Sequence, residues 1–254
     1  MARRRLVAGN WKMHTGVAEA LALADAIRAG LPAQPPCDIL LLPPFISLWA
    51  VGRRLAGDAR LQLGAQNMHW AQPGPHTGEI AAAMLTDLCT HVLLGHSERR
   101  QEFGETDAVV HRKVESALTC GLLPIVAVGE TLAEHEAGRA GQVVRAQIGA
   151  AVGGLSEDEA ARCTVAYEPR WAIGTGRAAS VEDAVAAGAA IRGELREQVG
   201  PVAETVRILY GGSVDETNAA AFFAAPAIDG ALVGGASLRP DAFCAIVRAA
   251  GPAG

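Results

Sequence analysis

Eight short apolar runs recur along the chain of 254 residues, and they constrain the fold more than any other feature of the sequence. Each run is rich in valine, isoleucine or leucine and does not alternate between apolar and polar residues. The runs cover residues 6–8, 39–42, 61–65, 92–94, 124–128, 164–167, 206–210 and 231–233. Continuous apolar runs of this length are typical of strands that are buried on both faces of a parallel sheet.

Segments with helical periodicity lie between the runs. Three of them cover residues 17–29, 106–119 and 180–199, and the last begins with Ser180, a suitable N-cap, followed by acidic residues. The pattern predicts a single domain over residues 1–254, a closed (β/α)₈ barrel with eight parallel strands ringed by helices, since such barrels run to roughly 250 residues. An open doubly wound sheet is the alternative, but no GxGxxG sequence follows the first run.

Composition excludes several classes of protein. Hydrophobic residues make up 50% of the chain and charged residues 19%, which provides for a large core and argues against long disorder. The net charge of −5 gives no general basic field for nucleic acid. No apolar stretch approaches the length of a membrane helix, and the stretch after Arg3, Arg4 and Arg5 is too short for a signal peptide.

The five cysteines are odd in number, widely spaced and free of CxxC motifs. This usage is typical of reduced thiols rather than of a disulfide framework. We therefore expect a cytoplasmic protein.

Lysine is nearly absent, because 20 of the 22 basic residues are arginine and the two lysines are Lys12 and Lys113. Genomic composition is the simplest cause of the bias. Ammonium and guanidinium groups differ in size and hydrogen-bond geometry, so each lysine in such a chain is a candidate for a specific role. Lys12 follows the first apolar run, whereas Lys113 is expected on the surface of a helix.

Polar residues and glycines follow five of the apolar runs. They are Gly9, Asn10, Lys12, Gly95, His96, Ser97, Glu98, Glu168, Pro169, Gly211, Gly212, Ser213, Gly234, Gly235 and Ser237. In a barrel these positions meet at the carboxyl-terminal mouth, where barrel enzymes place their chemistry. Lys12, His96 or Glu168 alone would more often be a surface or structural residue, but five converging clusters predict a functional site.

Local sequence indicates what this site binds. Ser97 has the character of a helix cap, which would place His96 at a helix start, where the dipole favours a neutral imidazole. The glycine turns at 211–213 and 234–235 let backbone N–H groups approach an anion. We expect a short helix from about residue 238, whose N-terminus would favour phosphate. The small residues 172–176 are typical of a lid.

Seven short motifs occur in order along the chain. They are residues 10–13 (NWKM), 64–67 (GAQN), 95–100 (GHSERR), 167–169 (YEP), 171–176 (WAIGTG), 210–214 (YGGSV) and 233–238 (VGGASL). Together they resemble the triosephosphate isomerase family over essentially the whole chain.

The resemblance implies a TIM barrel that interconverts dihydroxyacetone phosphate and D-glyceraldehyde 3-phosphate through an enediolate, in glycolysis and gluconeogenesis, with neither metal nor cofactor. Glu168 matches the family's base, and His96 matches the electrophile that polarises the carbonyl. Lys12, ordered by Asn10, matches the cation beside the substrate phosphate and the developing oxyanion. The lid corresponds to residues 169–179. The phosphate-binding backbone corresponds to Gly174, Ser213, Gly234 and Gly235.

The chain departs from the family pattern at four positions. They are Arg170 in the lid hinge, Ala127, His14 and His76, where a small aliphatic residue, cysteine, asparagine and phenylalanine are common. None of them replaces a group with a chemical role. Arg170 is expected to alter the motion of the lid, and Ala127 leaves a smaller side chain to pack.

Residues 72–79 resemble the family's projecting third loop. The resemblance implies a homodimer in which this loop inserts into a second subunit, with Thr77 near Asn10 and Lys12 of the partner subunit. His76 is expected to change how the tip of the loop packs.

Two other functions compete with an active isomerase. One is a catalytically silent, phosphate-binding barrel that acts as a scaffold, against which Lys12, His96 and Glu168 occurring together argue. The other is a different phosphate-handling barrel enzyme, which would need another acid and base. Isomerase turnover discriminates between the three.

Overall fold

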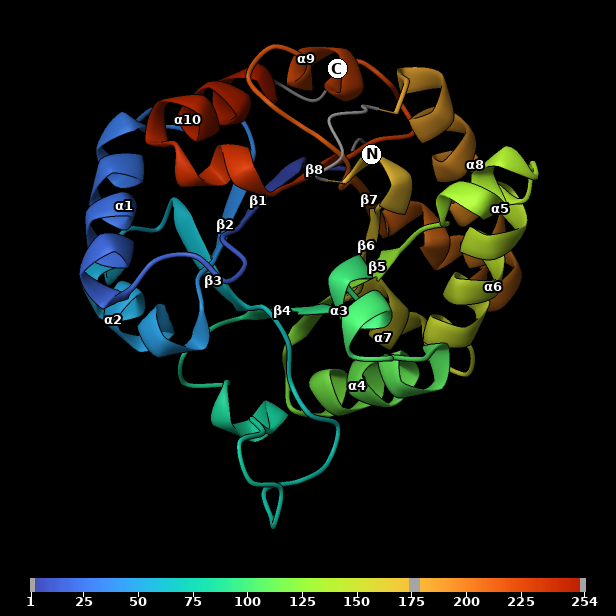
Figure 1. The fold of residues 1–254 in the computed structure, drawn as a ribbon, viewed down its shortest axis with the longest axis horizontal. Coiled ribbons are helices and arrows are strands. Elements are labelled where there is room, and N and C mark those ends of the chain that lie inside the picture. The colour runs from blue at the N-terminus through green and yellow to red at the C-terminus, as the bar shows by residue number, and fades with distance from the viewer. Residues whose placement is uncertain (1–2, 174–178, 252–254) are drawn as a thin grey trace.

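The computed structural model describes residues 3–173 and 179–251, and Figure 1 shows a ring of strands surrounded by helices. The strands form a closed parallel barrel in sequence order, with the last strand paired to the first. They are β1 (Leu6–Asn10), β2 (Asp38–Leu42), β3 (Leu61–Ala65), β4 (His91–Leu94), β5 (Leu123–Val128), β6 (Thr164–Tyr167), β7 (Arg207–Tyr210) and β8 (Gly230–Val233). The predicted barrel of eight parallel strands is confirmed.

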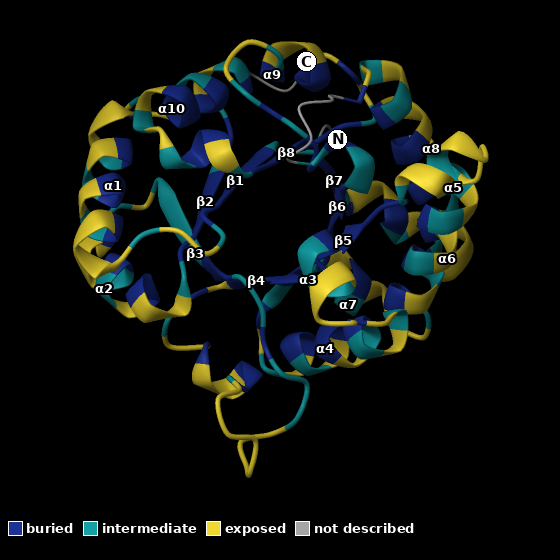
Figure 2. Ribbon diagram, in the orientation of Figure 1, coloured by how far each residue is buried: buried dark blue, intermediate teal, exposed yellow. Residues whose placement is uncertain are grey.

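Most strand residues are buried, as their continuous apolar runs predict, although the first three residues of β3 are half-buried (Figure 2). In β1, Leu6 and Ala8 belong to one buried cluster and Val7 to another, which packs against the helices. The first cluster fills the barrel and consists of Leu6, Ala8, Leu40, Leu42, Leu93, Ile125, Ala127, Ala166, Leu209 and Leu232. Because alternate residues serve opposite faces, both sets must be apolar, and Ala127 contributes only a methyl group to the interior.

The first strand is longer than its apolar run. It continues through Gly9, which pairs with Leu41 and Val233, to Asn10, which pairs with Leu42. Ladder hydrogen bonds use backbone groups and do not require apolar side chains. The prediction that Gly9 and Asn10 follow the strand is therefore wrong, and Asn10 stands on the rigid end of β1 at the mouth.

Helices cover the outside of the barrel (Figure 1). Three match the predicted segments, and Ser180 caps the last of these, since its Oγ accepts a hydrogen bond from the backbone N of Asp183 at 3.0 Å. The α-helices are α1 (Val17–Gly30), α2 (Phe45–Leu55), α3 (Ser97–Glu102), α4 (Asp107–Thr119), α5 (Leu132–Glu136), α6 (Ala140–Val152), α7 (Glu157–Ala161), α8 (Val181–Val199), α9 (Ala219–Phe223) and α10 (Pro240–Ala249). Short 3₁₀ helices are η1 (Ala82–Met84), η2 (Arg170–Ala172), η3 (Gly200–Thr205) and η4 (Gly235–Leu238).

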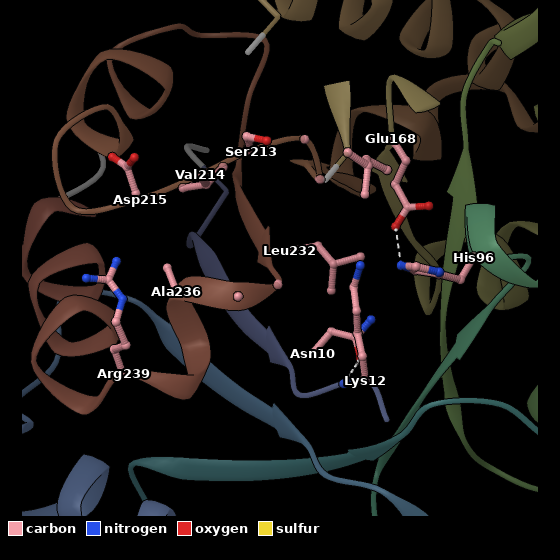
Figure 3. A pocket seen from close by; sticks show the side chains of 15 residues that line it. Asn10, Lys12, His96, Glu168, Ser213, Val214, Asp215, Leu232, Ala236 and Arg239 are labelled. Carbon is pink, nitrogen blue, oxygen red and sulfur yellow. Dashed lines mark hydrogen bonds and ion pairs between the residues drawn. The ribbon is translucent and has the colours of Figure 1, made fainter. Parts of the chain in front are cut away.

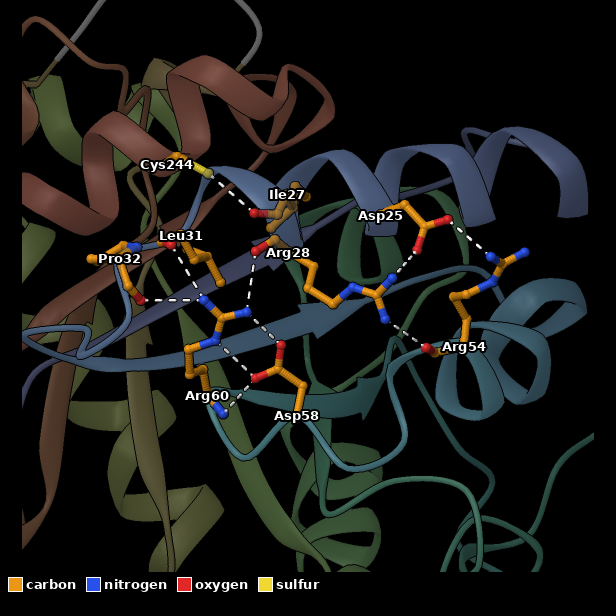
Figure 4. Close-up of polar contacts among 9 residues, drawn as sticks. All are labelled: Asp25, Ile27, Arg28, Leu31, Pro32, Arg54, Asp58, Arg60 and Cys244. Carbon is orange, nitrogen blue, oxygen red and sulfur yellow. Dashed lines mark hydrogen bonds and ion pairs between the residues drawn. The ribbon is translucent and has the colours of Figure 1, made fainter.

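Arg60 joins the turn before β3 to the end of α1 (Figure 4). Its Nη2 and Nε donate to the Asp58 carboxylate at 2.6 and 2.9 Å. The same guanidinium donates at 3.2 to 3.3 Å to the carbonyl oxygens of Arg28, Leu31 and Pro32. The hydrogen bond from Arg60 lowers the pKa of Asp58 below its ordinary value. Only the five-donor fork of arginine can serve a carboxylate and three carbonyls at once.

Lys113 is buried in α4, so its expected surface position is wrong. Only 3% of the residue is exposed. Its Nζ lies 2.5 Å from Oε1 of Glu105 and donates to Oδ1 of Asn67 at 2.7 Å. Burial lowers the pKa of Lys113, although the hydrogen bond with Glu105 opposes this change. A buried ammonium needs such partners, because leaving it unpaired costs several kcal/mol.

No helix within residues 3–173 and 179–251 is long and apolar enough to span a membrane. The five cysteines are free thiols. Burial raises the pKa values of Cys37 and Cys163 to about 12. Thiols with such pKa values stay protonated near neutral pH and are therefore unreactive.

Candidate active site

A cavity of about 290 Å³ opens at the carboxyl-terminal mouth of the barrel (Figure 3). The predicted site residues that line it are Asn10, Lys12, His96, Glu168, Ser213, Gly234 and Gly235. Predicted Gly174 lies outside the described residues, as do the other residues of the expected lid from 175 to 178. The structure therefore brings together every predicted site residue that it describes.

Glu168 follows β6 directly and points its carboxylate into the cavity. Its backbone N donates to the carbonyl oxygen of Val128 at 2.7 Å, and the residue is 2% exposed. Oε2 accepts a hydrogen bond from the backbone N of Ser97 at 2.8 Å, while Oε1 lies 3.1 Å from Nε2 of His96. A buried carboxylate with few donors is well placed to exchange protons.

Two glycines make room for Glu168. A Cβ on Gly129 would lie 1.7 Å from the Glu168 carbonyl oxygen, and a Cβ on Gly211 would lie 2.9 Å from the Glu168 Cγ. Both approaches are shorter than van der Waals contact, so a larger residue at either position would displace Glu168. The predicted glycine turn after β7 thus also leaves the space that the Glu168 side chain occupies.

His96 is the N-cap of α3, and Ser97 is the first helical residue, so the prediction that Ser97 caps this helix is wrong. Nδ1 of His96 accepts a hydrogen bond from the backbone N of Glu98 at 3.3 Å. An accepting Nδ1 carries no proton, so the hydrogen-bond pattern assigns the proton of the neutral ring to Nε2. Nε2–H is then the donor that faces the cavity.

Lys12 adopts a left-handed backbone conformation, with φ of 52°. Its backbone N donates to Oδ1 of Asn10 at 3.0 Å, and its carbonyl oxygen accepts from Nε2 of Gln66 at 2.9 Å. Such a conformation costs on the order of 1–3 kcal/mol for a residue with a side chain and persists only where neighbours fix it. Gln66 thus positions Lys12. It lies in motif 64–67, but no role was predicted for it from the sequence.

The ammonium of Lys12 is paired with Glu98, and the Nζ–Oε1 distance is 2.6 Å. Burial raises the pKa of Glu98, but the hydrogen bond from Lys12 and nearby positive charge outweigh this effect and bring the pKa below its ordinary value. Glu98 is therefore ionised near neutral pH. An anionic ligand in the cavity would compete with it for the ammonium.

The opposite side of the cavity consists of the turns after β7 and β8. Helix η4 begins at Gly235, three residues before the expected start, and Ser213 Oγ donates to the Ala172 carbonyl oxygen at 2.7 Å. Asp215 and Arg239 also line the cavity and were not predicted. Arg239 is paired with Glu216 at 3.0 Å, so its cationic group lies at the rim.

Glu130 fixes the segment after Glu168. It is fully buried, and its Oε1 accepts hydrogen bonds from Tyr167 Oη at 3.0 Å and from Trp171 Nε1 at 2.7 Å. Its carbonyl oxygen accepts from the backbone N of Arg170 at 3.0 Å. Burial and the charge of Glu130 raise the pKa of Tyr167 well above its ordinary value. No role was predicted for Glu130, because its hydrogen-bond partners depend on packing and not on a local pattern.

Within the part of the chain that the structure describes, no group of three or more histidine, cysteine, aspartate or glutamate side chains could hold a metal ion. The chemistry that the described site offers is a carboxylate base, a neutral imidazole donor, and a cation beside glycine turns. These groups suit proton transfer next to a carbonyl in an anionic substrate.

Comparison with known proteins points to the same chemistry. Residues 5–250 match the family model described as triosephosphate isomerase. A triosephosphate isomerase of Herpetosiphon aurantiacus is 51% identical over 97% of this chain and 99% of its own. The triosephosphate isomerase of Symbiobacterium thermophilum is 50% identical over 99% of this chain and 98% of its own. The chain therefore belongs to the triosephosphate isomerase family.

Proposed function

We propose that Glu168 and His96 carry out the isomerisation that family membership assigns to this chain, the interconversion of dihydroxyacetone phosphate and D-glyceraldehyde 3-phosphate. The observation that carries the proposal is the buried pair in the mouth cavity, in which Oε1 of Glu168 lies 3.1 Å from Nε2 of His96. A base and a proton donor thus face the same small space.

Glu168 removes a proton from one substrate carbon and returns it to the next. The carboxylate is held by His96 and by the backbone N of Ser97. Substrate would replace these donors and place its reacting carbon against the carboxylate. A positioned base contributes roughly 10²–10⁴-fold to the rate of such a transfer.

His96 donates from Nε2 to the substrate oxygens as negative charge develops on them. Because its Nδ1 already accepts from the backbone N of Glu98, the ring can give a hydrogen bond at Nε2 without turning. A donor that is fixed before the reaction costs no reorganisation when the enediolate forms. Lys12 adds a positive charge on the same side.

The phosphate binds between Lys12 and the turns that contain Ser213, Gly234 and Gly235. A Cβ on Gly234 would lie 3.5 Å from Cε of Lys12, so the ammonium stem and this turn share one wall of the cavity. The phosphate takes no part in the reaction, but its binding free energy holds the reacting carbons against Glu168.

No observation favours a barrel that binds phosphate without catalysis. That residues 1–254 form a single domain, and that the protein is cytoplasmic, stay predictions. The free thiols support the second prediction, since reducing compartments keep cysteines unpaired.

The chain forms a homodimer through the loop around Thr77 in this proposal. Residues 72–79 are exposed and project from the barrel between β3 and β4 (Figure 1). A second cavity of about 490 Å³ next to the mouth includes Lys12, Met13 and Phe103 in its lining. Met13 is 97% exposed and Phe103 is 66% exposed, an apolar area that a projecting loop of a second copy would cover.

The experiment is turnover of D-glyceraldehyde 3-phosphate in a coupled assay with the Glu168→Gln variant. We expect at least a hundredfold loss of turnover, with binding of 2-phosphoglycolate retained, because the amide cannot accept the proton. The matched control is Glu197→Gln, which alters an exposed carboxylate of α8. Near-normal turnover of Glu168→Gln would contradict the role of the base, and binding without turnover in the unaltered protein would instead support a silent barrel.

A further inference from the structure

Four side chains outside the mouth cavity form a continuous stack that runs from α4 to the tip of the projecting loop. The guanidinium carbon of Arg112 lies 4.5 Å from the ring centroid of Trp70. The rings of Trp70 and His69 lie 4.1 Å apart, and those of His69 and His76 lie 4.6 Å apart. These are distances of cation–π and ring–ring attraction. We call Arg112, Trp70, His69 and His76 the loop stack.

The loop stack ties an otherwise exposed loop to the body of the protein. His69 stands at the base, where its backbone N donates to the Ile80 carbonyl oxygen at 2.8 Å and its Nδ1 accepts from the backbone N of Ala71 at 3.0 Å. Residues 72–79 are all exposed, so their side chains have little packing of their own. The contact between His69 and His76 links the tip to the base of the loop, and backbone hydrogen bonds from His76 to Gly74 and from Glu79 to His76 complete the turn.

We infer that the loop stack preforms residues 72–79 for docking onto a second copy of this chain, and that proton binding by its two imidazoles weakens this docking. The inference rests on the proposed dimer and adds how its association is controlled. A loop that already has its bound shape loses less conformational entropy on binding. Two stacked imidazolium ions would repel each other and open the tip.

The charges around the stack oppose protonation. Burial lowers the pKa of His69, and the positive charges of His76, Lys113 and Arg112 lower it further, whereas the carboxylate of Glu79 raises it. A neutral imidazole at His69 therefore suits this environment, and an added proton there disturbs it. The stack already ends in one permanent cation, the guanidinium of Arg112.

The proposed docking cavity carries balanced charge and an apolar lining. Its charged groups are Lys12, Arg99, Glu98 and Glu102, two of each sign. Glu98 is already paired with Lys12 at 2.6 Å. Its apolar lining includes Met13, Phe45 and Phe103. The apolar part of this lining favours a neutral ring over a charged one, because a charge loses hydration against it.

The test is sedimentation velocity over a dilution series at pH 7.5 and pH 5.5, with circular dichroism to monitor the fold. We expect the dimer dissociation constant of the unaltered chain to rise at least tenfold at the lower pH. His76→Phe keeps a ring in the stack but cannot bind a proton, so its dissociation constant should change less than twofold. The matched control is His111→Gln, because Nδ1 of His111 lies 3.3 Å from the Ala151 carbonyl oxygen, away from the stack.

The variant Arg112→Gln tests the preforming role at pH 7.5, where the fold is not under acid stress. Loss of the guanidinium should raise the dissociation constant at least threefold. A dissociation constant that does not depend on pH, equal pH dependence in His76→Phe, or no effect of Arg112→Gln would overturn the inference and leave the dimer standing. An unaltered chain that is monomeric at pH 7.5 would overturn the proposed dimer itself.

Discussion

His91 makes the fold sensitive to acid, and the size of the effect follows from its surroundings. The residue is 2% exposed at the start of β4, and its Nδ1 lies 2.8 Å from Thr90 Oγ1. Burial, with the charge of Arg207 against the opposing charge of Asp38, lowers the pKa of His91 from 6.5 to about 4. The folded protein therefore holds this imidazole neutral at pH values at which the unfolded chain protonates it.

The sign of the effect follows from proton linkage. Above pH 6.5 both states are neutral at this position, and the contribution of His91 to stability is fully present. As the pH falls from 6.5 towards 4, the unfolded state binds the extra proton and the free energy of unfolding decreases by about 1.4 kcal/mol per pH unit. The loss at pH 5 is roughly 2 kcal/mol, a large part of a typical stability of about 5–15 kcal/mol.

The variant His91→Gln keeps a polar side chain but cannot titrate in this range. Urea unfolding at pH 7.5, 6.5 and 5, at fixed protein concentration because of the proposed dimer, should show a steeper loss for the unaltered chain. The difference in the free energy of unfolding between the two proteins should change by roughly 2 kcal/mol between pH 7.5 and pH 5. Parallel stability profiles would refute the assignment to His91, because all other titrating groups are common to both proteins.

Two further predictions concern the mouth of the barrel. Lys12→Arg should lower kcat/KM about a hundredfold, because a planar guanidinium cannot take the position of the compact ammonium. Unfolding midpoints of the two proteins serve as a control for the fold, and an unchanged kcat/KM would contradict the role of Lys12. Arg170→Val should raise kcat and change its dependence on solvent viscosity. The variant keeps the backbone hydrogen bond to Glu130 but loses the charged side chain at the proposed hinge. If its steady-state rates in sucrose solutions equal those of the unaltered chain, the Arg170 side chain does not restrain this segment.

The barrel was predictable because its signal is repeated. Each strand of a closed parallel barrel must be apolar on both faces, and this requirement marks eight separate segments of the chain. The ends of strands were less predictable. Asn10 extends β1 because Leu42 offers a paired backbone, and this pairing partner is remote in the sequence.

The site was predictable where motifs carried it and was not predictable where packing positions it. Lys12, His96 and Glu168 lie in motifs and carry groups that suggest their chemistry. Gln66, although it lies in motif 64–67, and Glu130 act through hydrogen bonds whose partners include residues 54 and 41 positions away. An inward-facing glutamine or glutamate has no local pattern that reveals its partner. The same holds for the cap of α3, which depends on the side-chain direction of His96.

The composition indicates that each of the two lysines could have a specific role, but only their packing shows what that role is. Both have a carboxylate partner, Glu98 for Lys12 and Glu105 for Lys113, with Nζ–Oε1 distances of 2.6 and 2.5 Å. The side chain of Lys12 is 24% exposed and lines the mouth cavity, so an incoming anion can replace its partner. The side chain of Lys113 is 4% exposed, and the second donation to Asn67 leaves no route for exchange. The lysine–glutamate pair at the mouth can thus be replaced by a ligand, whereas the pair in the core stays fixed. The difference lies in the solvent exposure of the two lysines and not in the residue types.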